Sequence, residues 1–167
     1  MRSIIGIIVM LSVSLLVTGE GEETGVTVVE NKFETLALIT KRSINEVLRG
    51  DKAYLVLFKK SSKEKNCDRC VEFNEVWEQA VHEYIDVLGF AVADVDTRAG
   101  RDFADKFEIG EQGFPNVKMF SGDRRPIGVV TRETVTYEVF ESRLKPLLAA
   151  IQKGADGFYH KSVNDDL

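Results

Sequence analysis

Residues 53–84 read AYLVLFKKSSKEKNCDRCVEFNEVWEQAVHEY, and this stretch decides the fold. The run from Ala53 to Phe58 is almost continuously apolar, as in a strand that is buried on both faces. The polar residues 59–66 then form a loop that leads directly to Cys67. After Cys70, apolar residues recur at helical spacing. The stretch therefore predicts a buried strand, a loop and an amphipathic helix that begins at a Cys-x-x-Cys pair.

The flanking sequence predicts further strands and helices in alternation. Ser43 and Glu46 form a capping-box pattern, so a short helix is expected to open there and to end before Gly50. A glycine-rich turn at Gly110 and Gly113 precedes Pro115. Strands are expected at 35–40, 87–95, 116–120 and 127–130, the last two joined by a hairpin turn at 121–123, and helices at 101–107 and 134–153, the latter kinked at Pro146.

The order of these elements predicts an α/β protein. Strands that alternate with helices early in the chain imply a parallel sheet covered on both faces, and the late hairpin adds an antiparallel edge. This mixed sheet flanked by helices is the architecture of a thioredoxin fold. We expect one such domain over residues 35–153, because 167 residues are too few for two ordinary domains.

Two cysteines are present, Cys67 and Cys70. A small secreted domain stapled by disulfides usually carries about four or more. A disulfide between these two cysteines closes a very short loop and constrains little of the unfolded chain. A redox role therefore explains the pair better than stabilisation of the fold does. A zinc site needs roughly four ligands, and only His82 and His160 are available besides carboxylates, at a spacing that fits no zinc module. We therefore expect no metal and no cofactor.

The sequence resembles the protein disulfide isomerase branch of the thioredoxin superfamily over roughly residues 35–150. The most specific part is residues 94–123, DVDTRAGRDFADKFEIGEQGFPNVKMFSGD, which is similar to the family's run from its third strand to the aromatic-proline step and the strand beyond. The resemblance implies that Phe114 and Pro115 form that step, and that Pro115 is cis and lies against the disulfide. It also implies a disulfide oxidoreductase whose partners are cysteine-containing client proteins, with glutathione or another oxidoreductase as redox partner.

The sequence departs from the family pattern at several positions. The family usually has Trp-Cys-Gly-His-Cys where this chain has Asn66-Cys-Asp-Arg-Cys70, and the loop before Cys67 is about four residues longer than usual. Leu57 stands where the family commonly places a buried acidic residue, and Glu75 replaces a proline of the active-site helix. Arg132 matches an arginine that approaches the thiols in some members.

Thiol–disulfide exchange requires a thiolate. At a helix start, Cys67 would face unsatisfied backbone N–H groups and the positive end of the helix dipole, both of which stabilise a negative sulfur. Arg69 should lower the pKa of Cys67 and Asp68 should oppose this. We expect Cys67 to be the exposed nucleophile and Cys70 the buried resolving thiol. Nearby lysines add positive charge (Lys59, Lys60, Lys63 and Lys65).

Three functions fit these features. The first is an oxidoreductase that forms, reduces or reshuffles disulfides in secretory proteins. The second is a redox-gated adaptor that holds clients with little turnover, which Leu57 and the missing tryptophan before Cys67 favour. The third is the role of a related domain, the lumenal thioredoxin-like domain of an oligosaccharyltransferase subunit. The formal charge of −5 argues against a nucleic-acid partner.

The two ends of the sequence indicate the secretory pathway. Arg2 precedes an apolar run of about 14 residues, which is the length of a signal-peptide core and short of the roughly 20 needed to span a membrane. We expect a signal peptide at 1–19 (the alternative is an uncleaved signal anchor), an acidic lead-in at 20–34 and no span in the mature chain. The tail at 154–167 ends in Asn164-Asp165-Asp166-Leu167, which resembles endoplasmic-reticulum retrieval signals. The expected location is the reticulum lumen, with secretion as the alternative.

Overall fold

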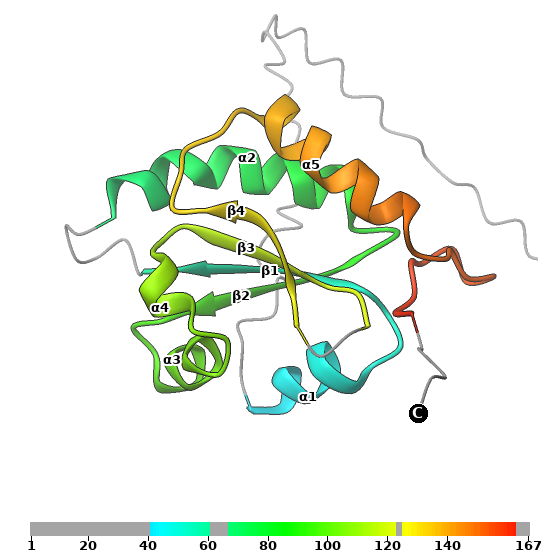
Figure 1. Ribbon diagram of the computed structural model, residues 1–167, viewed down its shortest axis with the longest axis horizontal. Helices are drawn as coiled ribbons and strands as arrows, with labels where there is room; N and C mark the ends of the chain where they lie inside the picture. The colour runs from blue at the N-terminus through cyan, green and yellow to red at the C-terminus, as the bar shows by residue number, and fades with distance from the viewer. Residues whose placement is uncertain (1–40, 61–66, 123–124, 163–167) are drawn as a thin grey trace, which may run out of the picture. The chain divides into compact units, whose positions relative to one another are not determined.

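The computed structural model describes residues 41–60, 67–122 and 125–162 (Figure 1). Several predicted features lie outside these residues: the signal peptide, the acidic lead-in, the strand at 35–40, Lys63, Lys65 and the C-terminal tetrapeptide. No helix in the described ranges is both long and apolar enough to cross a membrane.

The described chain contains helices on both faces of a sheet (Figure 1). The strands are β1 (Tyr54–Lys59), β2 (Gly89–Asp94), β3 (Asn116–Phe120) and β4 (Ile127–Thr131). The helices are α1 (Lys41–Arg49), α2 (Asp68–Tyr84), α3 (Arg98–Asp105), α4 (Ile109–Gln112) and α5 (Tyr137–Ala149).

The sheet is mixed, with the strand order β2-β1-β3-β4. β1 pairs with β2 in parallel and with β3 in antiparallel orientation, and β4 is antiparallel to β3. This confirms the predicted α/β class, the mixed sheet and the late antiparallel hairpin. Because β3 runs opposite to β1, its first residue, Asn116, pairs with Phe58 near the last residue of β1. The proline step before β3 therefore lies at the same end of the sheet as the last residues of β1.

The apolar run of β1 contributes to two cores. Leu55 and Leu57 pack with α2 and α5 on one face, whereas Val56 and Phe58 pack with α1 and α3 on the other. All four side chains are at most 1% exposed. β1 is continuously apolar because a central strand between two helical layers has no face in water, as the sequence predicted.

The boundaries of three helices differ from the prediction. α1 begins at Lys41, so Ser43 lies inside the helix and the predicted capping box is wrong. α3 begins at Arg98 because the Thr97 hydroxyl caps it, accepting from the Gly100 N–H at 3.1 Å. α5 begins at Tyr137, after the Thr136 cap, and contains Pro146. For α3 and α5 a capping threonine, not the apolar periodicity, sets the first residue.

The short helix α4 occupies the predicted glycine-rich turn. Ile109 starts it and is fully buried, while Gly110 lies within it. Gly113 then ends the helix with φ +85°, a backbone conformation that favours glycine. The segment still turns the chain toward Pro115, but through one helical turn.

Residues 153–162 pack against the start of the sheet. The Ala53 N–H donates to Tyr159 O at 2.8 Å, and the Tyr159 N–H donates to Val87 O at 2.8 Å. The Lys161 ammonium donates to the carbonyls of Val47 and Gly50, at 2.7 and 2.6 Å, at the end of α1. The first half of the expected tail is therefore anchored to the domain.

Candidate redox site

The two cysteines form a disulfide at the first turn of α2. Cys67 is the N-cap residue of α2, and its Sγ is bonded to that of Cys70 at 2.04 Å. The Cys67 carbonyl accepts from the Cys70 N–H at 2.9 Å and from the Val71 N–H at 3.4 Å, which closes the first turn of the helix. Cys67 is half-buried, whereas Cys70 is 5% exposed. The Cys67 sulfur is therefore the accessible one, at the end of α2 where backbone N–H groups lack helical partners.

A cavity of about 430 Å³ opens beside Cys67. Its lining residues come from the start of α2, from the residue before Pro115 and from the end of β4: Cys67, Asp68, Arg69, Glu72, Phe114 and Arg132. All but Glu72 were predicted to belong to the site. Glu72 carries no motif signal, because an acidic residue in the second turn of a helix is ordinary in sequence.

The Phe114–Pro115 peptide bond is cis, as the family resemblance implied. Pro115 is buried and does not line the cavity, which Phe114 reaches in its place. The Pro115 carbonyl accepts from the Arg132 N–H at 2.8 Å. This hydrogen bond joins the proline step to the residue that follows β4.

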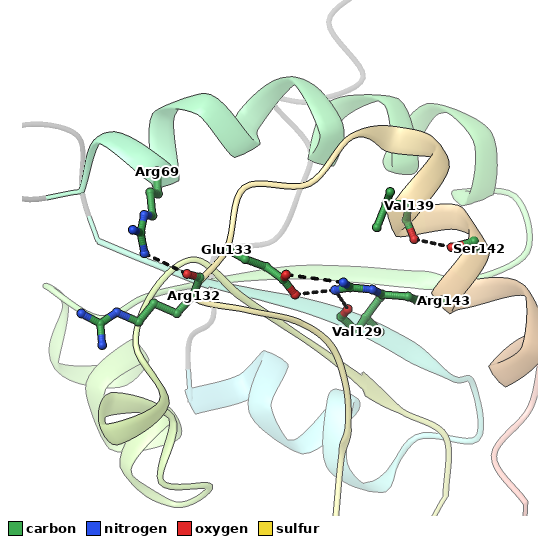
Figure 2. Close-up of polar contacts among 7 residues, drawn as sticks. All are labelled: Arg69, Val129, Arg132, Glu133, Val139, Ser142 and Arg143. Carbon is green, nitrogen blue, oxygen red and sulfur yellow. Dashed lines mark hydrogen bonds and ion pairs between the residues drawn. The ribbon is translucent and has the colours of Figure 1, made fainter.

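Arg69 connects α2 to the same segment. Its Nη1 donates to the Arg132 carbonyl at 3.0 Å (Figure 2). A second contact lies one turn further along α2, where the Thr134 hydroxyl donates to Glu72 Oε2 at 2.9 Å. The residues after β4 are thus held against the start of α2 by two hydrogen bonds that the sequence did not predict.

Leu57 lies on the α2 side of the sheet and is 1% exposed. Its neighbours in this core are apolar, among them Phe73 and Val117. Within the described ranges, the only buried charged residue is Lys118. Lys118 alternates with Val117 along β3 and pairs with Val56, which places it on the opposite face. The described residues thus put no buried acid behind the disulfide.

A polar network behind the proline step was not predicted. The Lys118 ammonium donates to Gln112 Oε1 at 2.6 Å, and Asn116 Nδ2 donates to Gln112 Oε1 and to Gly113 O, each at 3.4 Å. Burial lowers the pKa of Lys118 below its usual value. The network links α4 to the first residues of β3. The sequence indicates this network only through the spacing of Asn116, Lys118 and Phe120. Alternate residues of a strand share a face, so two polar residues lie on one buried face of β3.

Helix α2 runs without interruption through Glu75, the position where the family has a proline. Its buried side chains (Cys70, Phe73, Trp77, Ala80 and Val81) face the core as the helical spacing predicted. Among the described residues, no group of three or more His, Cys, Asp or Glu side chains is arranged to hold a metal ion.

The sequence matches no protein-family model and no curated protein. Solved structures do match. The oxidised form of mitochondrial thioredoxin 3 from Saccharomyces cerevisiae aligns with a TM-score of 0.51 and 16% identity, over 68% of this chain and 97% of that protein. The J-Trx1 fragment of ERdj5 aligns with a TM-score of 0.51 and 12% identity, over 68% of this chain and 50% of the fragment. The chain therefore has a thioredoxin-like fold that carries a Cys-x-x-Cys disulfide at the start of α2.

Proposed function

We propose that this protein is a thiol–disulfide oxidoreductase that acts on cysteine-containing proteins. The observation that carries the proposal is the unequal exposure of the two sulfurs, with Cys67 open to a cavity and Cys70 buried. A client thiolate would attack Cys67 Sγ, which breaks the Cys67–Cys70 bond and leaves Cys70 as the thiolate. Attack by a second client thiol on the mixed disulfide would release an oxidised client and a reduced Cys67. The reverse sequence reduces a client disulfide.

Mixed-disulfide trapping tests this assignment. Cys70→Ser should accumulate client disulfides through Cys67, because the thiol that would release them is missing. Cys67→Ser should trap few, since Cys70 is buried. Equal trapping by both variants, or trapping by Cys67→Ser alone, would reverse the assignment. Loss of insulin-disulfide reduction in both variants, but not in the native protein, would establish turnover.

A more specific part of the proposal is a disulfide-isomerase-like role in the endoplasmic reticulum, with glutathione or another oxidoreductase as redox partner. It is supported by the apolar N-terminal run, the terminal tetrapeptide and the resemblance over residues 94–123. Deleting residues 165–167 should cause the protein to be secreted into the medium. Unchanged retention in the cell would contradict a retrieval signal at this end. A Cys67–Cys70 midpoint potential near or above about −180 to −210 mV would support transfer of the disulfide to clients.

A redox-gated adaptor is the second candidate, and the burial of Leu57 among apolar side chains favours it. The family's buried acid moves protons to and from the thiols, and the described residues supply no equivalent. The adaptor reading predicts efficient trapping by Cys70→Ser together with slow insulin reduction by the native protein. Introducing the acid as Leu57→Asp should then raise turnover, provided the variant folds.

A further inference from the structure

The Arg132 backbone adopts a conformation that few arginines adopt. Its φ is +54°, in the left-handed region, where a residue other than glycine is uncommon. Its N–H donates to Pro115 O and its carbonyl accepts from Arg69, so both peptide groups are fixed. A Cβ placed on Gly113 would lie 2.6 Å from Arg132 Cδ, which shows that the arginine stem lies against that glycine. The surrounding segments thus fix the direction of this side chain.

The guanidinium itself has no hydrogen-bond or ion-pair partner in the described part of the chain. The adjacent Glu133 is turned toward Arg143, with which it forms an ion pair, and so does not neutralise Arg132 (Figure 2). Figure 2 shows the Arg132 guanidinium pointing away from both of these residues. Arg132 is thus a lining residue of the cavity beside Cys67, and its guanidinium has no partner among the described residues.

The two sides of the cavity differ in charge. The α2 side carries two carboxylates and one cation (Asp68, Glu72 and Arg69), whereas Phe114 and Arg132 line the other side. Of the two lining cations, Arg69 donates to the Arg132 carbonyl, so a negatively charged client group would find its unpartnered guanidinium at Arg132. A guanidinium also suits a carboxylate, because its planar fork donates two parallel hydrogen bonds.

From these contacts we infer that Arg132 is a specificity-determining residue, which binds the carboxylate of an acidic residue close to the client cysteine. The inference rests on the proposed oxidoreductase function and adds the kind of client sequence that the site selects. The chemical step is unchanged: the peptide thiolate displaces Cys70 from Cys67 Sγ, and no other oxidant is needed. Arg132 donates hydrogen bonds to the peptide and takes no part in the electron transfer.

The test uses short thiol peptides that are identical except for Glu, Gln or Lys placed two residues before or after the cysteine. The rate of mixed-disulfide formation is measured with the oxidised full chain and with Arg132→Lys, Arg132→Gln and, as a control, Arg98→Gln. Arg98 is a solvent-exposed arginine on α3. Dividing each Glu-to-Gln rate ratio by the ratio that the same peptides give with a small-molecule disulfide cancels the intrinsic reactivity of the peptides.

We expect the native protein and Arg98→Gln to favour the Glu peptide about three- to tenfold in one of the two placements. Arg132→Lys should keep part of this preference, and Arg132→Gln should lose it. Equal rates for Glu and Gln in the native protein, or an unchanged preference in Arg132→Gln, would overturn the inference and leave the oxidoreductase function standing.

If no peptide reacts, the oxidoreductase proposal fails, and a binding experiment still tests Arg132. Peptides with serine in place of cysteine are titrated while the Arg132 Nε–H resonance is followed by NMR. A shift with the Glu peptide and none with the Gln peptide supports the carboxylate site. No shift with either peptide contradicts it.

Discussion

Phe73 links the disulfide helix to both the sheet and α5. Its side chain is fully buried and packs edge-on against Phe140, with 6.2 Å between the ring centres. It lies one turn after Cys70, whereas Val71, next to Cys70 in sequence, is 56% exposed. The position of Cys70 therefore depends on how Phe73 is packed, and little on Val71.

Phe73→Ala should destabilise the protein by about 3–5 kcal/mol, because it removes a large buried ring and leaves a cavity. Val71→Ala on the same helix should change the unfolding free energy by less than about 0.5 kcal/mol. Urea denaturation of both variants in the disulfide form measures the two effects. Similar losses in the two variants would mean that the burial of Phe73 contributes little.

Lys118 makes the stability depend on pH. Burial lowers the pKa of its ammonium in the folded state, so at neutral pH folding leaves a charged amine in an unfavourable environment. As pH rises toward the usual lysine range, the unfolded chain binds more protons at this group than the folded chain does. Stability should therefore increase over that interval. Burial also lowers the pKa of Lys161, which contributes in the same direction.

Replacing Lys118 by methionine should reduce the rise in unfolding free energy between about pH 7 and pH 9.5. Above about pH 10 the tyrosines oppose this trend, because burial raises the pKa values of Tyr54, Tyr84 and Tyr137. Lys106→Met, at an exposed position beside α3, serves as the control and should leave the slope unchanged. An identical slope in native protein and Lys118→Met would show that this amine does not titrate anomalously.

At the scale of elements, the connection between β4 and α5 is held from both sides. Arg69 and Glu72 hold it to α2, and Arg143 of α5 donates to the Val129 carbonyl of β4 at 3.2 Å (Figure 2). Arg143 also pairs with Glu133, and this hydrogen bond is the main cause of the lowered pKa of Glu133. The end of β4 thus contacts two helices, and this arrangement fixes Arg132 between them.

A double-mutant cycle of Glu133→Gln and Arg143→Met should give a coupling energy of no more than about 1 kcal/mol, because both side chains are partly in water. The coupling should be present at pH 7 and disappear in acid. Because the folded-state pKa of Glu133 is lowered, its contribution exists above the carboxylate's usual pKa and is lost as pH falls through the folded value. The unfolding free energies of the four proteins at pH 7 and pH 3 provide the measurement. A coupling that does not weaken between pH 7 and pH 3 would contradict the assignment.

For the molecule as a whole, the sheet topology decides which parts of the chain meet. β1 leads into the loop before Cys67, and antiparallel β3 starts beside its end, so Cys67 and Phe114 line one cavity although they are far apart in sequence. The opposite end of β1 is covered by the segment around Tyr159, whose backbone bonds to Ala53 and Val87. Residues 153–162 therefore complete the domain at the end of the sheet away from the disulfide.

Ending the chain after residue 153 should lower the unfolding free energy by at least about 2 kcal/mol, because it removes the packing of Tyr159 and the Lys161 cap of α1. Ending it after residue 162 keeps all of these contacts and should avoid this loss. Chemical denaturation of the two truncated proteins separates the effects. Equal stability of both would show that the anchored segment is dispensable.

The sequence by itself determined the apolar β1, the helical face of α2, the mixed α/β order, the Cys-x-x-Cys pair and, through family resemblance, the cis bond before Pro115. These features are encoded by local periodicity or by a motif contiguous in the chain. Only the tertiary structure decided which side chains share the cavity, where α1 and α5 begin, that Lys118 is buried beside Gln112, and that the Arg132 guanidinium has no partner among the described residues. These properties depend on contacts between residues distant in sequence, because strand pairing and helix packing, not local pattern, bring those residues together.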